Sequence, residues 1–330
     1  MVPMSTEGGT KAVIAALLAN SGIAVTKFGA WMLTGASSML AESIHSVADA
    51  GNQGLLLLGG KRAQREATSE HPFGFGRERY VYSFIVAIVL FSVGGLFALY
   101  EAFHKYEEVH SGAPNELLES RWWWVPLVVL GAAILMEGFS FRTAIKESNH
   151  TRGGKSWIQF VRRAKSPELP VILLEDFAAL IGLTLAMIGV GLSLLTGSGY
   201  WDVAGTAAIG LLLVTVAIIL AIEMKSLLLG ESATTENNTA IRTALEGDGT
   251  GDRTEVLHLR TLHIGPEQVL VAAKLRIERG DTGAEVAAQI NAAEERARAA
   301  TPDLELTIYL EPDLVRRDAD AAPAWDAGTR

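Results

Sequence analysis

Long runs of apolar residues dominate the first two thirds of the chain. A helix needs about 20 predominantly apolar residues to cross a bilayer. We expect spanning helices at 11–33, 36–59, 80–104, 122–145, 168–196 and 201–224. The pattern therefore predicts a polytopic α-helical membrane protein with six transmembrane helices. Its membrane domain would occupy residues 11–230, after a disordered N-terminus at 1–10.

The hydrophobic period changes after residue 230. We expect helices at 237–246 and from Thr282 onward, and strands at 255–262, 268–277 and 304–310. Thr282 and Glu285 have the spacing of a capping box, which marks the start of the second helix. This αββαβ order predicts a small ferredoxin-like α+β domain over residues 231–312. Residues 313–330 hold little to bury and are expected to be disordered.

Basic residues indicate the orientation in the membrane. They concentrate in the loops after the second and fourth predicted helices: Lys61, Arg62, Arg65, Arg77 and Arg79, then Lys146, Arg152, Lys155, Arg162, Arg163 and Lys165. Cytoplasmic loops are enriched in Lys and Arg. Both termini and the soluble domain are therefore expected in the cytoplasm, as an even number of spans also requires. In a bacterium the protein would lie in the inner membrane.

Composition excludes several kinds of partner and site. The net charge of −9 argues against nucleic acid. The chain has no cysteine, so neither disulfides nor thiolate metal sites are available. We find no nucleophile–base set and no phosphate-binding loop, so we do not expect an enzyme.

Polar residues inside the predicted spans point to a functional site. A charge at the centre of a spanning helix costs roughly 2.5–3.5 kcal/mol, so such residues are functional candidates. In the second predicted helix, Glu42, His45 and Asp49 are spaced three and four residues apart and share one helix face. The fifth predicted helix contains Glu175 and Asp176.

Depth along the helices suggests that some of these groups meet. At about 1.5 Å per residue, Asp49 and Asp176 lie roughly 15 Å and 12 Å from the cytoplasmic helix ends. The turn near residue 35 sets Asn20 level with Asp49, and Lys27 level with Glu42 as a buried ion pair.

Imidazole and carboxylate groups together suit Zn²⁺. Because such groups also titrate, a site built from them naturally exchanges metal for protons.

A polar stripe can also hold helices together through hydrogen bonds. That interpretation suits the Lys27–Glu42 pair. It also suits Glu137 and Glu101, which we interpret as packing or end-of-helix residues. It is a poor account of Asp49, because an unpaired aspartate at this depth is costly without a cation.

Three sequence features together resemble the cation diffusion facilitator family. They are Asn20 and Lys27 in the first predicted helix, the segment 35–49 (Gly-Ala-Ser-Ser-Met-Leu-Ala-Glu-Ser-Ile-His-Ser-Val-Ala-Asp), and the segment 71–78 (His-Pro-Phe-Gly-Phe-Gly-Arg-Glu). The fifth predicted helix is most similar to the zinc transporter 9 branch. The resemblance implies a homodimeric antiporter that exports Zn²⁺ or a similar ion in exchange for protons. It also implies a transport site of His45, Asp49 and Asp176.

Three positions depart from the family pattern. Ile172 stands where a histidine usually precedes Asp176 by one turn, so Glu175 or water is the candidate for a fourth ligand. This gap admits Mn²⁺, Fe²⁺ or Co²⁺ as cargo, or a non-transporting regulatory subunit. Glu311 and Phe75 replace histidines of the usual soluble-domain and loop motifs. We therefore expect little or no metal in the soluble domain.

Overall fold

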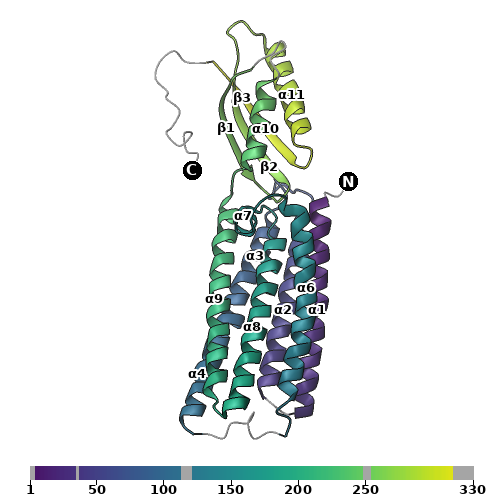
Figure 1. Cartoon of the computed structure of the whole chain (residues 1–330). Coiled ribbons are helices and arrows are strands. Elements are labelled where there is room, and N and C mark those ends of the chain that lie inside the picture. The colour runs from purple at the N-terminus through teal and green to yellow at the C-terminus, as the bar shows by residue number, and fades with distance from the viewer. Residues whose placement is uncertain (1–3, 35–36, 113–120, 248–253, 315–330) are drawn as a thin grey trace. The chain divides into compact units, whose positions relative to one another are not determined.

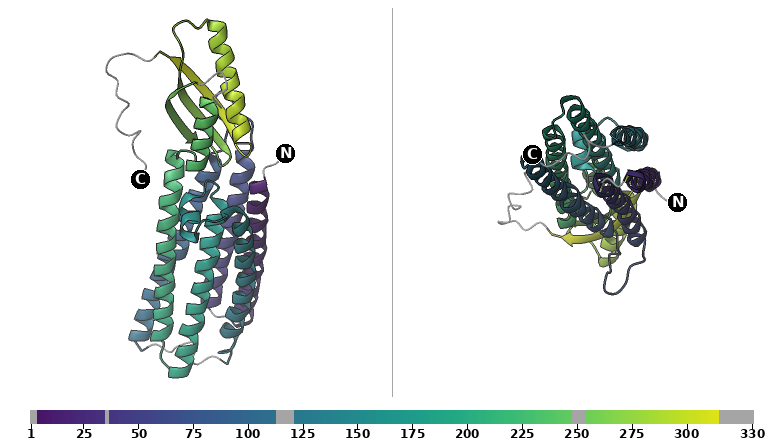
Figure 2. Two further views of the ribbon diagram at one scale, coloured as in Figure 1. Left: turned by 45° about the horizontal axis from the view of Figure 1, so that its top comes forward. Right: turned by 90° about the horizontal axis from the view of Figure 1, so that it is seen from below.

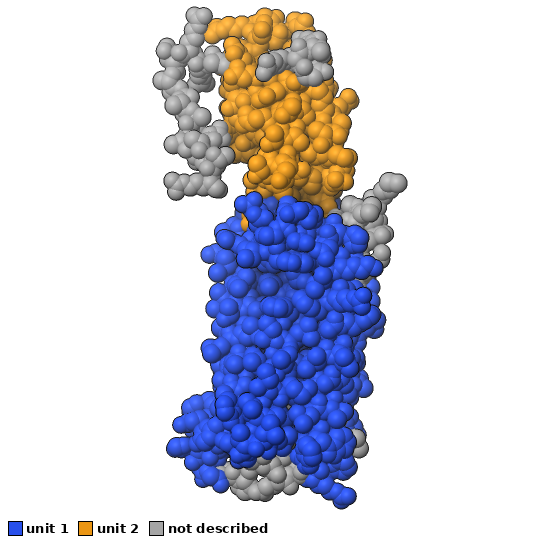
Figure 3. Space-filling model, in the orientation of Figure 1, with its two compact units in different colours: residues 1–229 blue, residues 230–330 orange. Residues whose placement is uncertain are grey.

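The structure is a computed structural model that describes residues 4–34, 37–112, 121–247 and 254–314. Within the first two helices it does not describe the side chains of 4–12, 30–31, 33–34, 37–42 and 44–45. The chain divides into two compact units, Met1–Leu229 and Gly230–Arg330 (Figure 3).

The first unit is a bundle of long helices that run side by side (Figures 1 and 2). Its elements are α1 (Met4–Thr34), α2 (Ser37–Ala63), α3 (Glu78–Val89), the π-helix η1 (Leu90–Leu96), α4 (Phe97–His110), α6 (Val125–Arg152), α7 (Trp157–Arg163), α8 (Glu168–Thr196) and α9 (Tyr200–Leu229). Helix α3, η1 and α4 form one continuous stretch of 33 residues. Helix α1 begins at Met4, inside the segment for which the sequence predicts a disordered N-terminus.

Length and apolar composition identify which helices can cross a membrane. Among the described residues, 4 helical stretches meet both conditions: Glu78–His110, Val125–Arg152, Glu168–Thr196 and Tyr200–Leu229. Helix α1 contributes the shorter apolar stretch Val13–Gly29. Helix α2 is less apolar because the polar stripe containing Asp49 interrupts it. The unit is therefore a helical membrane domain.

The outer surface of the bundle supports its placement in lipid. Large apolar side chains are exposed along the helices, among them Leu18, Leu135 and Leu195. Exposed tryptophans precede α6, and Tyr200 and Trp201 open α9. Aromatic residues at helix ends are typical of the membrane–water interface.

Small residues allow close contact between α9 and its neighbours. A Cβ atom at Gly205 would lie 3.2 Å from the carbonyl oxygen of Leu185 in α8. A Cβ atom at Gly210 would lie 2.8 Å from Leu99 Cδ2 in α4. Glycines at such crossings let helix backbones approach each other, which is how membrane helices commonly pack.

The second unit is a small α/β region. It contains α10 (Thr235–Glu246), β1 (Val256–His263), β2 (Gln268–Arg276), α11 (Gly283–Ala300) and β3 (Glu305–Asp313). The sheet order is β1-β2-β3, with β1 antiparallel and β3 parallel to β2. Helices α10 and α11 cover one face of the sheet (Figure 1). Their buried contacts with alternate β2 residues form the core.

The predicted start of the second helix in this unit is confirmed. Thr282 is the N-cap of α11, and its side chain accepts a hydrogen bond from the Glu285 backbone N–H while the Glu285 side chain accepts from the Thr282 backbone N–H. Strand β3 extends to Asp313. Residues 315–330, most of the tail predicted to be disordered, lie outside the described residues.

Candidate functional site

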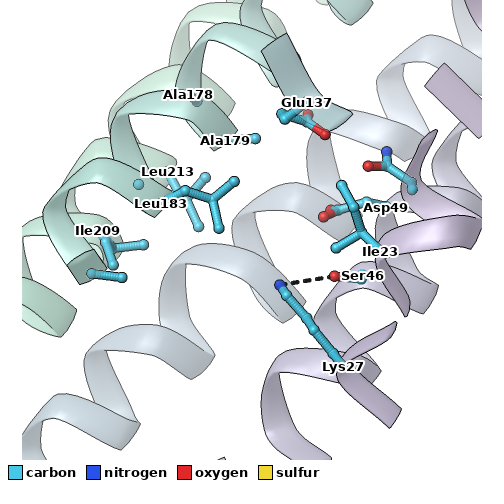
Figure 4. A pocket seen from close by; sticks show the side chains of 13 residues that line it. Ile23, Lys27, Ser46, Asp49, Glu137, Ala178, Ala179, Leu183, Ile209 and Leu213 are labelled. Carbon is cyan, nitrogen blue, oxygen red and sulfur yellow. Dashed lines mark hydrogen bonds between the residues drawn. The ribbon is translucent and has the colours of Figure 1, made fainter. Parts of the chain in front are cut away.

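A cavity of ≈ 60 Å³ lies between the helices of the membrane unit. Five helices supply its walls: α1, α2, α6, α8 and α9. Its lining residues are Asn20, Ile23, Lys27, Ser46, Asp49, Glu137, Ala178, Ala179, Gly182, Leu183, Ala186, Ile209 and Leu213 (Figure 4). One wall is apolar, whereas α1, α2 and α6 supply the charged and polar groups.

Helices α1 and α2 bring four of these polar groups together. Asn20 and Asp49, for which the sequence predicts a common depth, line the same cavity. Lys27 is buried, and its Nζ donates a hydrogen bond to Ser46 Oγ at 3.0 Å (Figure 4). The Lys27–Glu42 ion pair remains a prediction, because the Glu42 side chain lies outside the described residues.

Asp176 is fully buried in α8, about one turn before the residues of that helix that line the cavity. Its Oδ2 accepts a hydrogen bond from Ser140 Oγ of α6 at 2.8 Å. Its Oδ1 has no hydrogen-bond partner among the described residues. Asp176 precedes the lining residue Ala179 by three positions, which places both on the same face of the helix. The described lining of the cavity does not include Asp176, which lies one turn before it with one carboxylate oxygen unsatisfied.

Glu175 occupies a different environment. Its Oε1 accepts a hydrogen bond from Asn52 Nδ2 and its Oε2 one from Gln53 Nε2, each at 2.9 Å. Gln53 in turn accepts a hydrogen bond from Asn20 Nδ2 at 3.4 Å. This network ties α1 and α2 to α8. The described lining of the cavity does not include Glu175.

Glu137 lines the cavity, although the sequence led us to interpret it as a packing residue. Its exposed fraction is only 2%. The sequence did contain a signal for this role, because an acidic residue within a predicted spanning helix is a functional candidate. The sequence of α6 alone does not show how this helix packs against its neighbours, and that packing places Glu137 in the cavity.

His45 lies in α2 one turn before Asp49, and its side chain is outside the described set. Among the side chains that are described, no three His, Asp or Glu residues form a metal-binding group. The combination of His45, Asp49 and Asp176 therefore stays a prediction.

Apolar helices around a cavity lined by two carboxylates define a multi-pass integral membrane protein of the transporter class. Residues 13–229 match the cation efflux transmembrane domain. The chain thus belongs to the cation efflux, or cation diffusion facilitator, family of transporters, and it is not an enzyme.

Three relatives illustrate the range of similar proteins. The human "Proton-coupled zinc antiporter SLC30A9, mitochondrial" is 32% identical over 244 residues, which are 73% of this chain and 42% of that protein. The "Metal tolerance protein C4" of Arabidopsis thaliana is 28% identical over 76% of this chain and 54% of its own length. The "Magnetosome protein MamB" of a Magnetospira strain is 25% identical over 49% of this chain and 54% of its own length. The chain therefore spans less than half of the human relative and about half of the other two.

Proposed function

We propose that this protein exports divalent cations, chiefly Zn²⁺, from the cytoplasm in exchange for protons. His45, Asp49 and Asp176 would hold the ion within the membrane, and alternating access would expose it to each side in turn. The observation that carries this proposal is the fully buried carboxylate of Asp176, which has one unsatisfied oxygen and lies one turn before the wall of the cavity that Asp49 lines. The human relative named a proton-coupled zinc antiporter supports both the cargo and the coupling.

The energetics of burial support a cation as the missing partner. A buried carboxylate oxygen without a partner costs at least about 1–3 kcal/mol relative to a satisfied one. Asp176 Oδ1 has no such partner among the described residues. Either a metal ion or a proton would remove this penalty. Since both compete for the same groups, metal uptake releases protons, which is the basis of exchange.

We assign Glu175 a supporting role in this site. To bind an ion, its carboxylate would have to give up its hydrogen bonds to Asn52 and Gln53. Retaining them keeps α2 in register with α8, and so holds Asp49 close to Asp176.

The proposal includes a topology and an assembly. We propose six spanning segments, formed by α1, α2, the stretch from α3 to α4, α6, α8 and α9, with both termini in the cytoplasm. The basic residues in the loops after α2 and α6 support this orientation. In a bacterium this membrane would be the inner membrane. The family resemblance suggests a homodimer.

Metal flux into proteoliposomes tests the function. Purified protein would be reconstituted with an imposed pH gradient, and uptake of Zn²⁺, Mn²⁺, Fe²⁺ and Co²⁺ would be followed separately. We expect Zn²⁺ flux that increases with the gradient and falls to background in Asp49→Asn and Asp176→Asn. Asp202→Asn is the matched control, because Asp202 pairs with Lys105 at 3.1 Å, and neither residue lines the described cavity.

The outcome separates the alternatives. Faster flux of Mn²⁺, Fe²⁺ or Co²⁺ than of Zn²⁺ would reassign the cargo and keep the mechanism. Folded protein that carries none of the four metals would contradict transport and favour a regulatory subunit.

A further inference from the structure

Glu137 is the buried acid of the cavity that the site described so far does not use. It projects from α6 and lines the cavity together with Asp49 (Figure 4). Only 2% of its surface is exposed. Among the described residues, its carboxylate makes no hydrogen bond or ion pair. A buried acid in a membrane helix normally pairs with another group. The described side chains provide no hydrogen-bond or ion-pair partner for Glu137.

The position of Glu137 on α6 directs it toward Asp176. Ser140 follows Glu137 by three residues, so both lie on one face of the helix. Ser140 donates a hydrogen bond to Asp176 Oδ2, which shows that this face meets α8 at Asp176. Glu137 therefore approaches the site from a helix other than those that carry Asp49 and Asp176.

The site lacks a donor one helical turn before Asp176. Ile172 lies one turn before Asp176 in α8, and it is fully buried in the apolar core. Its side chain offers no ligand atom. Zn²⁺ in proteins prefers four ligands in a tetrahedral arrangement. The three proposed ligands thus leave one position open.

We propose that Glu137 supplies this fourth donor, so that α2, α6 and α8 all contribute oxygen ligands once the ion draws their carboxylates together; in the described structure these three groups do not yet form a metal-binding cluster. The inference rests on the proposed function and identifies a ligand that the family motif does not contain.

Zinc binding to the full-length protein tests the proposal directly. Affinity would be measured at fixed pH in nanodiscs by competition with a chromogenic zinc chelator. We expect Glu137→Gln to weaken binding at least about tenfold, since loss of groups that merely support ligands already costs about 10–100-fold. Glu137→Asp, which keeps the carboxylate, should fall between Glu137→Gln and the unchanged protein. Glu101→Gln in α4 is the matched control and should bind as the unchanged protein does.

Co²⁺ absorption adds a readout of coordination. Replacing the carboxylate by an amide in Glu137→Gln should change the visible spectrum of the bound Co²⁺. An effect on packing alone would leave the spectrum unchanged.

The variants separate two kinds of failure. If Glu137→Gln binds zinc with full affinity and an unchanged Co²⁺ spectrum while Asp49→Asn loses binding, Glu137 is not a ligand and the proposed function stands. If Asp49→Asn also binds with full affinity, the proposed transport site itself is wrong. If Glu137→Gln fails to fold, equal zinc affinity of Glu137→Asp and the unchanged protein together with identical Co²⁺ spectra would overturn the inference.

Discussion

At the scale of single residues, the sequence predicts which polar groups lie within the membrane helices, but it predicts only some of their contacts. Helix geometry predicts a common depth for Asn20 and Asp49, and both residues line the cavity. The environment of Glu175 could not be predicted, because its partners Asn52 and Gln53 lie 123 and 122 positions away in the chain. The position of Glu137 in the cavity could not be predicted either, because all the other described lining residues belong to other helices.

Ile172 provides a test of how the site selects its cargo. Ile172→His would place an imidazole one turn before Asp176. Imidazole suits Zn²⁺, whereas carboxylate and water suit Mn²⁺. We expect the ratio of Zn²⁺ flux to Mn²⁺ flux to rise several-fold in proteoliposomes. Ile172→Val, which adds no donor, is the control, and an equal ratio in both variants would contradict a ligand at this position.

At the scale of helices and strands, hydropathy alone predicts the most apolar elements best. Helices α8 and α9 follow the expected spans closely, and α8 begins and ends at the predicted residues. The π-helix η1 between α3 and α4 was not predicted. It contains Gly95, where a Cβ atom would lie 2.7 Å from Val214 Cγ2 of α9. The cap of α11 was predictable because the capping box is local.

Packing of α9 against α4 depends on Gly210. A Cβ atom there would lie 2.8 Å from Leu99 Cδ2 and 3.0 Å from the Leu99 backbone nitrogen. Overpacking of this kind costs about 1–3 kcal/mol, so Gly210→Ala should lower the thermal unfolding temperature in detergent. Gly54→Ala is the control, since a Cβ atom at Gly54 meets nothing within 4 Å. A similar decrease in both variants would show that the crossing is not the cause.

The capping box of α11 should make this helix sensitive to acid. The hydrogen bond from the Thr282 backbone N–H, aided by the Thr282 hydroxyl, lowers the pKa of Glu285 below its usual value. A lowered pKa in the folded state stabilises the helix above the unfolded pKa of about 4.3, and this contribution is lost as pH falls through the folded value. Hydrogen exchange in the full chain should therefore show easier opening of α11 below about pH 4. Glu285→Gln should abolish that dependence and Glu295→Gln should retain it; equal behaviour of the two would refute the assignment.

At the scale of the whole molecule, the candidate site lies within the membrane unit, and the family match covers residues 13–229 of the same unit. The polar groups of the site come from helices separated by long stretches of chain. Sequence could therefore predict the unit and most of its helices, but not which side chains meet. The α/β region has its own apolar core and its own helix caps.

Exchange of metal for protons at one buried site is the central claim, and the most direct test reverses the driving force. Proteoliposomes with equal pH on both sides would receive a Zn²⁺ gradient, and internal pH would be followed with an enclosed dye. We predict proton movement against the direction of Zn²⁺ flow, absent in Asp49→Asn and present in Asp202→Asn. Zn²⁺ flux with no accompanying proton movement would contradict the account.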